Sequence, residues 1–134
     1  MESRRKENTK KKMKRFVPTL LVMVLLAGMT VLAKEYSIYL SPGAISYTST
    51  VTKGNGNQYT TIDTKGTDRI YVRYTVVNSS KSAVTDMAKI DGSRAITLNY
   101  NQKMTERSVV SLKMENNTTD NSGRFVTAAG TWTP

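Results

Sequence analysis

Cysteine and histidine are both absent from this chain of 134 residues. Without cysteine, no disulfide can form, no lipid can be attached to a cysteine behind a leader, and no thiol can act as a nucleophile. Without histidine, Ser-His-Asp triads, Cys-His pairs and histidine-ligated zinc sites are excluded. A folded domain in this chain must therefore be held by its hydrophobic core alone.

Common signatures of catalysis are missing from residues 34–134 as well. Neither Ser-x-x-Lys nor Gly-x-Ser-x-Gly occurs there, which removes two frequent serine-nucleophile patterns. Asp63 with Asp68, or the Asn-rich stretch 116–121, offers oxygen atoms for calcium, but neither has EF-hand spacing and both are typical of turns. A glycosidase-type pair of carboxylates stays open, because such a pair forms in space. We expect no enzyme, no metal site and no cofactor, and a carboxylate-based hydrolase is the third interpretation.

The first 33 residues have the composition of a secretory signal. Residues 1–15 contain eight basic and two acidic residues, and an uncharged apolar run follows over 16–33. The run ends in Val-Leu-Ala with Ala33 last, which places small residues at the third and first positions before a cut. We therefore predict a helical signal peptide over 1–33, cleavage after Ala33 and one secreted domain over 34–134. The long basic segment resembles the export signals of Gram-positive bacteria.

An uncleaved membrane anchor is the alternative interpretation of the same segment. Eighteen uncharged residues are at the short end of what spans a bilayer as a helix. Pro18 and Gly28 interrupt the run, which favours cleavage. A retained run would anchor the protein through residues 16–33 with the domain outside, and we expect no other contact with the membrane.

Most of the formal net charge of +10 belongs to the leader. Residues 34–134 hold twelve Lys and Arg against eight Asp and Glu, so the secreted domain carries only +4. No basic run survives in it, and nucleic-acid binding is therefore not expected. A weak preference for anionic surfaces, such as a bacterial envelope, is compatible with this charge.

Residues 34–134 read as a succession of short strands separated by turns. Ser, Thr and Asn make up about a third of them, and β-branched residues and tyrosines fill the stretches between turns. The segment 83–90 fits a strand or a short helix. The pattern predicts an all-β fold, a small antiparallel β-sandwich or small barrel of seven or eight short strands. The clearest predicted strands cover 36–40, 45–52, 58–62, 69–77, 94–100, 110–115 and 124–129.

Alternation within these runs also predicts the core. Each chosen residue is the apolar member of a pattern with a period of two. Trp132, the only tryptophan, is expected to be mostly covered and to hold the last strand in place. The other predicted core residues are Ile38, Ile45, Val51, Ile70, Val72, Tyr74, Val76, Ile96, Leu98, Val110, Leu112 and Phe125.

The strand predicted over 69–77 carries the best candidate for a contact surface. Its apolar residues point one way, and Arg69, Tyr71 and Arg73 share the other face. Tyrosine and arginine on a flat strand face offer stacking area with hydrogen-bond donors, which suits sugar or protein recognition. The competing interpretation is a strand face half covered by a neighbouring loop, with the arginines reaching water. We take Arg69, Tyr71 and Arg73 as candidate binding residues for a protein or glycan of the envelope.

A short part of the domain is similar to a known family. Tyr36-Ser37-x-Tyr39, Ser49-Thr50-Val51 and the Asn/Gly turn over 54–57 resemble small secreted lactococcin-type bacteriocins. The resemblance implies an all-β, exported protein that acts on the envelope of neighbouring cells, and it assigns a role to no residue. The leading interpretation is a non-catalytic secreted β-domain that binds at the bacterial cell envelope, and a secreted antimicrobial protein is the second.

Overall fold

The structure, a computed structural model, describes residues 33–134, and every regular element in this part is a β-strand. Among these residues, no helix is long and apolar enough to cross a membrane. The predicted signal peptide lies outside the described residues, apart from Ala33. The strands are β1 (Lys34–Leu40), β2 (Ile45–Tyr47), β3 (Val51–Thr52), β4 (Tyr59–Thr64), β5 (Tyr71–Asn78), β6 (Ala88–Asp91), β7 (Ala95–Asn99), β8 (Val109–Glu115) and β9 (Val126–Thr133).

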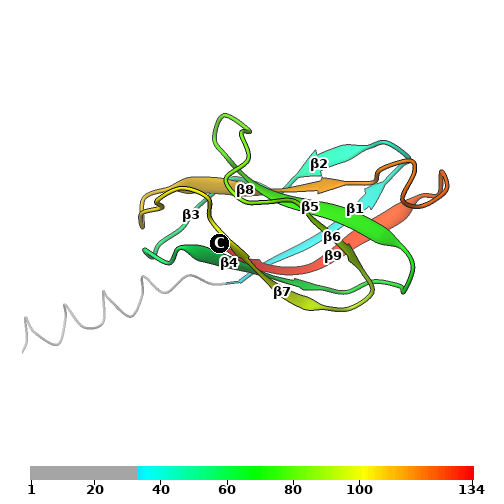
Figure 1. The fold of residues 1–134 in the computed structure, drawn as a ribbon, viewed down its shortest axis with the longest axis horizontal. Coiled ribbons are helices and arrows are strands. Elements are labelled where there is room, and N and C mark those ends of the chain that lie inside the picture. Colours follow the sequence, from blue (N-terminus) through cyan, green and yellow to red (C-terminus); the bar gives the residue numbers. More distant parts are fainter. Residues whose placement is uncertain (1–32) are drawn as a thin grey trace, which may run out of the picture. The chain divides into compact units, whose positions relative to one another are not determined.

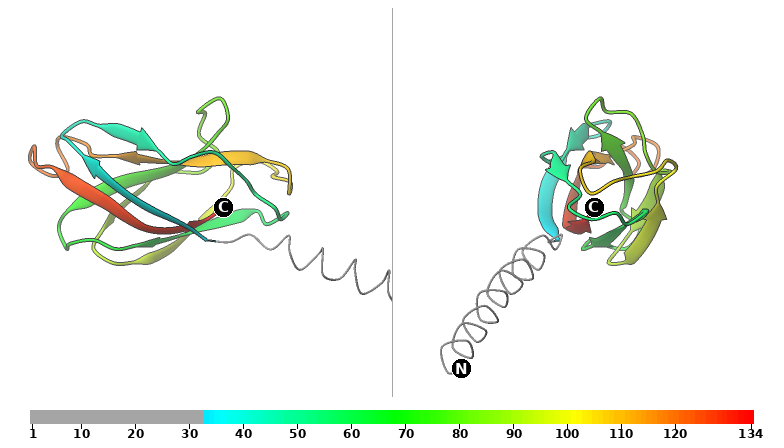
Figure 2. Two further views of the ribbon diagram at one scale, coloured as in Figure 1. Left: turned by 180° about the vertical axis from the view of Figure 1, so that it is seen from behind. Right: turned by 90° about the vertical axis from the view of Figure 1, so that its left-hand side faces the viewer.

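The strands form two antiparallel sheets that pack face to face (Figure 1). Sheet A has the order β1-β9-β4-β7, and sheet B has the order β2-β8-β5-β6, with β3 beside β8 as the continuation of β2. Apart from β2 to β3 and β5 to β6, every connection crosses to the opposite sheet, and this strand order is that of a jelly roll. Figure 2 shows the two sheets curving around a shared interior. The predicted all-β sandwich is confirmed.

The run predicted as one strand over 45–52 is interrupted between β2 and β3. The backbone N–H of Thr48 still donates to the Leu112 carbonyl at 2.9 Å. In return, the Leu112 N–H donates to the Thr48 hydroxyl at 2.9 Å instead of a backbone carbonyl. A side chain therefore replaces one link of the ladder, and β2 and β3 together occupy a single position beside β8.

The ambiguous segment over 83–90 is extended. It forms isolated bridges from Ala83 to Val77 and from Thr85 to Tyr100 before β6 begins at Ala88. The Thr85 hydroxyl also accepts a hydrogen bond from the backbone N–H of Val76 at 3.1 Å. These tertiary hydrogen bonds stabilise the extended conformation, whereas periodicity alone favours neither a strand nor a helix.

The interior between the two sheets contains most of the predicted core. Burial of each such side chain contributes about 1.5–3 kcal/mol to the free energy of folding. Trp132 is completely buried, as predicted, and its indole N–H donates to the Thr60 hydroxyl at 2.8 Å. The buried predicted residues are Val72, Tyr74, Val76, Val110 and Leu112, and Ile38, Val51, Ile70, Ile96 and Leu98 are partly buried against them.

The prediction was wrong for Phe125 and Ile45, which are 54% and 47% exposed. Residues an odd number apart in one strand point to opposite faces. Phe125 precedes the inward Trp132 by seven positions, so it points outward as the chain enters β9. Ile45 is paired with Glu115 on the outer face of sheet B, where solvent reaches it.

Two buried tyrosines connect the sheets. Tyr36 of β1 and Tyr74 of β5 pack edge to face with ring centroids 5.9 Å apart. The Tyr36 hydroxyl donates to the Tyr74 hydroxyl at 3.1 Å. Burial raises the pKa of both phenols, which favours the neutral forms that share this hydrogen bond.

Candidate binding surfaces

The structure places the three predicted site residues in two environments. Tyr71 and Arg73 project from β5 on the outer face of sheet B. Arg69 lies before the strand in a turn, with a positive φ of 63°, and its backbone N–H donates to the Asp91 carboxylate at 3.0 Å. The strand therefore begins two residues later than predicted, and Arg69 does not continue the row formed by Tyr71 and Arg73.

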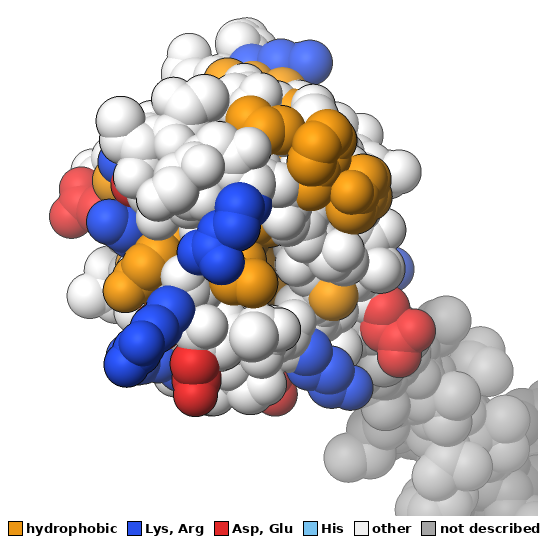
Figure 3. All heavy atoms as spheres, turned by 90° about the vertical axis from the view of Figure 1, so that its right-hand side faces the viewer, with side chains coloured by type: hydrophobic (Ala, Val, Ile, Leu, Met, Phe, Trp, Pro, Cys, Tyr) orange, Lys and Arg blue, Asp and Glu red, His pale blue; other side chains and the backbone are white. Residues whose placement is uncertain are grey.

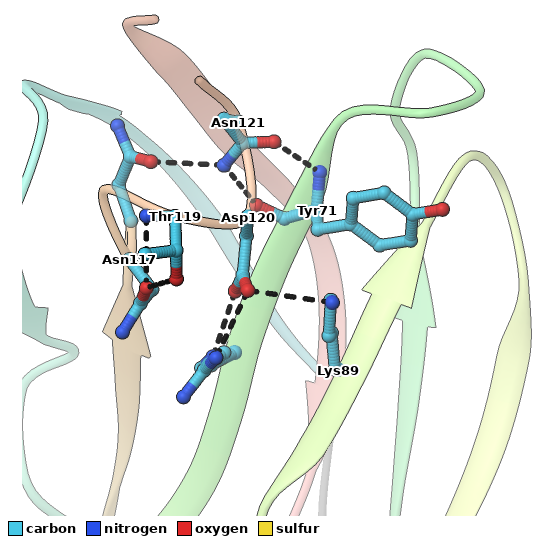
Figure 4. A network of polar contacts seen from close by, with 8 residues as sticks. Tyr71, Lys89, Asn117, Thr119, Asp120 and Asn121 are labelled. Carbon is cyan, nitrogen blue, oxygen red and sulfur yellow. Dashed lines mark hydrogen bonds and ion pairs between the residues drawn. The ribbon is translucent and has the colours of Figure 1, made fainter. Parts of the chain in front are cut away.

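The loop between β8 and β9, residues 116–125, folds over the start of β5 (Figure 4). The Asn121 side chain accepts from the Tyr71 N–H and donates to the Tyr71 carbonyl, both at 2.7 Å. It thereby satisfies this backbone as a neighbouring strand would. Its amide also donates to the Asn116 side chain at 2.9 Å, which holds the loop against the sheet.

Asp120 of the same loop compensates the charge of Arg73. Its carboxylate receives the Arg73 Nε at 2.7 Å and Nη2 at 2.9 Å, and the Lys89 ammonium lies 3.3 Å away (Figure 4). The Asp120 side chain is only 4% exposed. The hydrogen bond from Arg73 lowers the pKa of Asp120 below its usual value, and the same bond raises the pKa of Arg73. Both groups stay charged and paired at neutral pH.

On the outer face of sheet B, Tyr71 and Tyr47 each lie beside a loop and a lysine. The Lys89 ammonium lies 4.7 Å from the centroid of the Tyr71 ring. At the other end of the sheet, Lys81 from the β5–β6 loop lies 4.2 Å from the centroid of the Tyr47 ring. These cation–π contacts occupy one face of each ring. The binding role of Arg69, Tyr71 and Arg73 stays a prediction, on a surface that already has intramolecular partners.

The outer face of sheet A carries the well-exposed aromatic residues of the described part. Tyr39 of β1, Tyr59 of β4 and Phe125 beside β9 are 69%, 46% and 54% exposed. The rings of Tyr39 and Phe125 stack nearly parallel, with centroids 5.4 Å apart. Hydrophobic side chains gather at the end of the sandwich where β1 ends and β9 begins (Figure 3).

A shallow hollow of about 310 Å³ lies on the same sheet, beside β1 and β9. Gly130 is part of its lining, where β9 passes so close to β4 that a Cβ would lie 2.1 Å from the Asp63 carbonyl oxygen. The groups around it can donate and accept hydrogen bonds. Its lining comprises Glu35, Tyr36, Ser37, Lys65, Ala129, Gly130 and Thr131.

Threonines form rows across the outer face of sheet A. Thr97 of β7 pairs with Thr61 of β4, which pairs with Thr133 of β9. Thr131 and Thr127 continue the hydroxyl surface along β9, because alternate residues of one strand share a face. The sheet therefore presents neutral hydroxyls between the aromatic residues at its two ends.

The groups on these surfaces can take part in noncovalent recognition. Within residues 33–134, no three or more His, Cys, Asp and Glu residues are grouped so that they could hold a metal ion. Hydroxyls, an ammonium, a carboxylate and aromatic rings are the groups that sheet A offers. They suit a ligand that is hydrogen-bonded and stacked upon.

The sequence did not predict a contact surface on sheet A. Alternation shows which side chains of a strand face solvent, but not which strands lie side by side. The alternation that assigned Ile38 to the core also placed Tyr39 outside. The parity of Phe125 relative to Trp132 would have placed Phe125 outside as well. The pairing of β1 with β9, which brings Tyr39 and Phe125 together, joins the two ends of the domain and leaves no local signal.

No family model matches this chain, and no curated protein matches it. The fold defines the described part as a jelly-roll β-sandwich without disulfides. Jelly rolls carry many unrelated functions, so the fold alone assigns none to this protein, and its surfaces decide what it can bind.

Proposed function

We propose that the protein is a non-catalytic β-domain, secreted by a Gram-positive bacterium, that binds a component of the cell envelope. The observation that carries the proposal is that Tyr39, Tyr59 and Phe125 are all exposed on the outer face of sheet A, with Tyr39 and Phe125 stacked at one end of it. Exposed aromatic side chains are typical of binding sites, where they supply much of the contact energy.

The contrast between the two sheets supports sheet A as the contact surface. On sheet B, Arg73 is paired with Asp120, and Tyr71 lies against Lys89. On sheet A, Tyr39 is the most exposed of these aromatics, and its ring stacks on another exposed ring, that of Phe125. A partner can therefore cover Tyr39 and Phe125 without first breaking an ion pair.

Sedimentation of the purified full chain with isolated, lipid-free cell walls tests the proposal. The double variant Tyr39→Ala/Phe125→Ala should weaken binding by about tenfold or more, as expected for contact hot spots. All variants carry the same leader, so differences between them report on the domain. Equal thermal unfolding midpoints would show that the loss reflects contact rather than misfolding.

Tyr71→Ala is the matched comparison on sheet B. If Tyr71→Ala abolishes wall binding and the sheet A variant does not, the surface of Arg69, Tyr71 and Arg73 is the contact site. If the unchanged protein stays in the supernatant with walls from several Gram-positive species, the proposed function is wrong. Death of intact cells on addition of the protein would favour the antimicrobial interpretation instead.

A further inference from the structure

We infer that the ligand of sheet A is an extended, uncharged polysaccharide chain of the cell wall, lying diagonally from Tyr39 and Phe125 to Tyr59. The inference rests on the proposed function and names the class of molecule bound. Its starting point is that aromatic rings stand at both ends of one face, with hydroxyl groups between them.

The register of the strands gives the length of this face. Tyr39 pairs with Thr127, and Thr61 pairs with Thr133 six residues further along β9. Tyr59 lies two residues beyond Thr61 in the same direction, because β4 runs antiparallel to β9. At about 3.4 Å per residue, Tyr39 and Tyr59 are about 27 Å apart along the strands. That distance suits a linear polymer of several sugar units better than a single small molecule.

The groups between the aromatic ends match the chemistry of sugars. A threonine hydroxyl both donates and accepts a hydrogen bond, as each sugar hydroxyl does. Thr97, Thr61 and Thr133 lie in one row across three strands, which are about 4.8 Å apart. A regular array of short neutral hydroxyls can follow a polymer whose hydroxyls repeat along its length.

The hollow above Gly130 supplies a subsite on this diagonal. Ser37 lies in its lining, two residues from Tyr39 on the same face of β1 and therefore about 7 Å away. Glu35 can accept hydrogen bonds from sugar hydroxyls, and Lys65 can donate to them. A ring stacked on Tyr39 and a neighbouring unit in the hollow could be bound at once.

The charge of sheet A argues against an anionic polymer. Its strands contain Lys34, Glu35 and Asp63 as charged residues, and Lys65 follows β4 directly. Strands β7 and β9 contain no charged residue. The two lysines and two carboxylates balance, so this face offers a phosphate-bearing chain no net attraction, whereas an uncharged chain needs none.

The test uses cell walls whose phosphate polymers have been removed with cold hydrofluoric acid. The full chain should bind these walls as tightly as untreated ones, and soluble uncharged glycan strands, oligomers of N-acetylglucosamine, should compete. Tyr59→Ala should weaken binding about tenfold, although Tyr59 is far from Tyr39, whereas Tyr59→Phe should keep the affinity. Met87→Ala is the matched control, because Met87 is 48% exposed outside sheet A.

Each contrary result has its own meaning. Binding that disappears with the phosphate would assign an anionic polymer and overturn the inference while the proposed function stands. Competition by wall peptides in place of glycan strands, or no effect of Tyr59→Ala, would also overturn it. A dimer in analytical ultracentrifugation that Tyr39→Ala dissociates would make a second copy the occupant of this face. Failure to bind either kind of wall would remove the proposed function as well.

Discussion

Gly130 occupies a position where two strands of sheet A pack too closely for a side chain. Its φ is 150°, and a Cβ there would lie 2.1 Å from the Asp63 carbonyl oxygen and 2.9 Å from the Tyr36 hydroxyl. The backbone of β4 and a buried tyrosine therefore leave no room for a side chain at this position.

Gly130→Ala should lower the free energy of unfolding by about 3 kcal/mol, because a backbone carbonyl cannot move aside as a flexible side chain can. Denaturant unfolding of the full chain measures the change. Gly56→Ala is the matched control, since nothing lies within 4 Å of its added Cβ, and it should shift stability by no more than about 0.5 kcal/mol. Equal effects of the two substitutions would contradict this account.

Lys53 is a second residue whose environment is unusual. It has no exposed surface, and its ammonium lies 4.4 Å from the centroid of the Tyr100 ring. Among the described residues, that ammonium has no hydrogen-bond partner. Burial lowers the pKa of Lys53 below its usual value. The folded state therefore holds this amine at an energetic disadvantage.

Lys53→Met should raise stability at neutral pH by about 1 kcal/mol or more, because an apolar side chain of similar length needs no partner. The folded pKa of Lys53 is depressed, so between that pKa and about 10.4 the unfolded chain binds more protons and stability rises with pH. The difference between wild type and Lys53→Met should shrink as the pH is raised toward 9.5. Urea unfolding at several pH values tests this, with the exposed Lys103→Met as control.

At the scale of elements, the loop over 116–125 depends on polar contacts with β5. Asp120→Asn should remove the charge that holds Arg73 and Lys89, and so open the loop. Hydrogen exchange of the Tyr71 amide, which donates to Asn121, should accelerate about tenfold. Asp86→Asn, at an exposed position, should leave it unchanged. Unaltered exchange in Asp120→Asn would mean that the asparagines alone hold the loop.

Acid provides a second measurement of the same contact. The pKa of Asp120 is lowered by the hydrogen bond from Arg73, so its stabilising contribution is present above the unfolded value of about 3.9. That contribution is lost as the pH falls through the lower folded value. Stability of the wild type should therefore decline in this window more steeply than that of Asp120→Asn.

The same elements show what sequence can and cannot predict here. Alternation identified the strands and the buried face of β5, because Val72, Tyr74 and Val76 follow a strict period of two. It left open whether Tyr71 and Arg73 form a free surface or are half covered by a loop, and the structure shows a loop against both residues. The contact of Arg73 with Asp120 spans 47 residues and depends on how a loop returns over the sheet, which no local pattern contains. Hence the sequence predicted which side chains of β5 point inward and which point outward, but not which loop lies over the outward ones.

At the scale of the whole molecule, one core joins the two sheets. Leu112 is completely buried in sheet B, and Leu112→Ala should cost about 3 kcal/mol of stability. Val72→Ala should cost less, because fewer methyl groups are removed. Since both sheets share this core, each variant should still unfold in a single transition, seen equally by far-UV and near-UV circular dichroism. Val109→Ala, at an exposed position of β8, serves as control. An unchanged melt for Leu112→Ala would contradict the packing described.

Export of the molecule leads to the last prediction. The first ladder pair of sheet A joins Lys34 to Trp132, so β1 begins at the residue that follows the predicted cleavage site. Cleavage after Ala33 would leave every strand of the jelly roll in the released chain. Mass spectrometry of the protein in the culture medium should therefore show Lys34 as the first residue. Recovery of the chain from the membrane fraction with Met1 intact would instead support an anchor over residues 16–33. Replacing Ala33 by a bulky residue should block processing at that bond, because the peptidase requires a small side chain there.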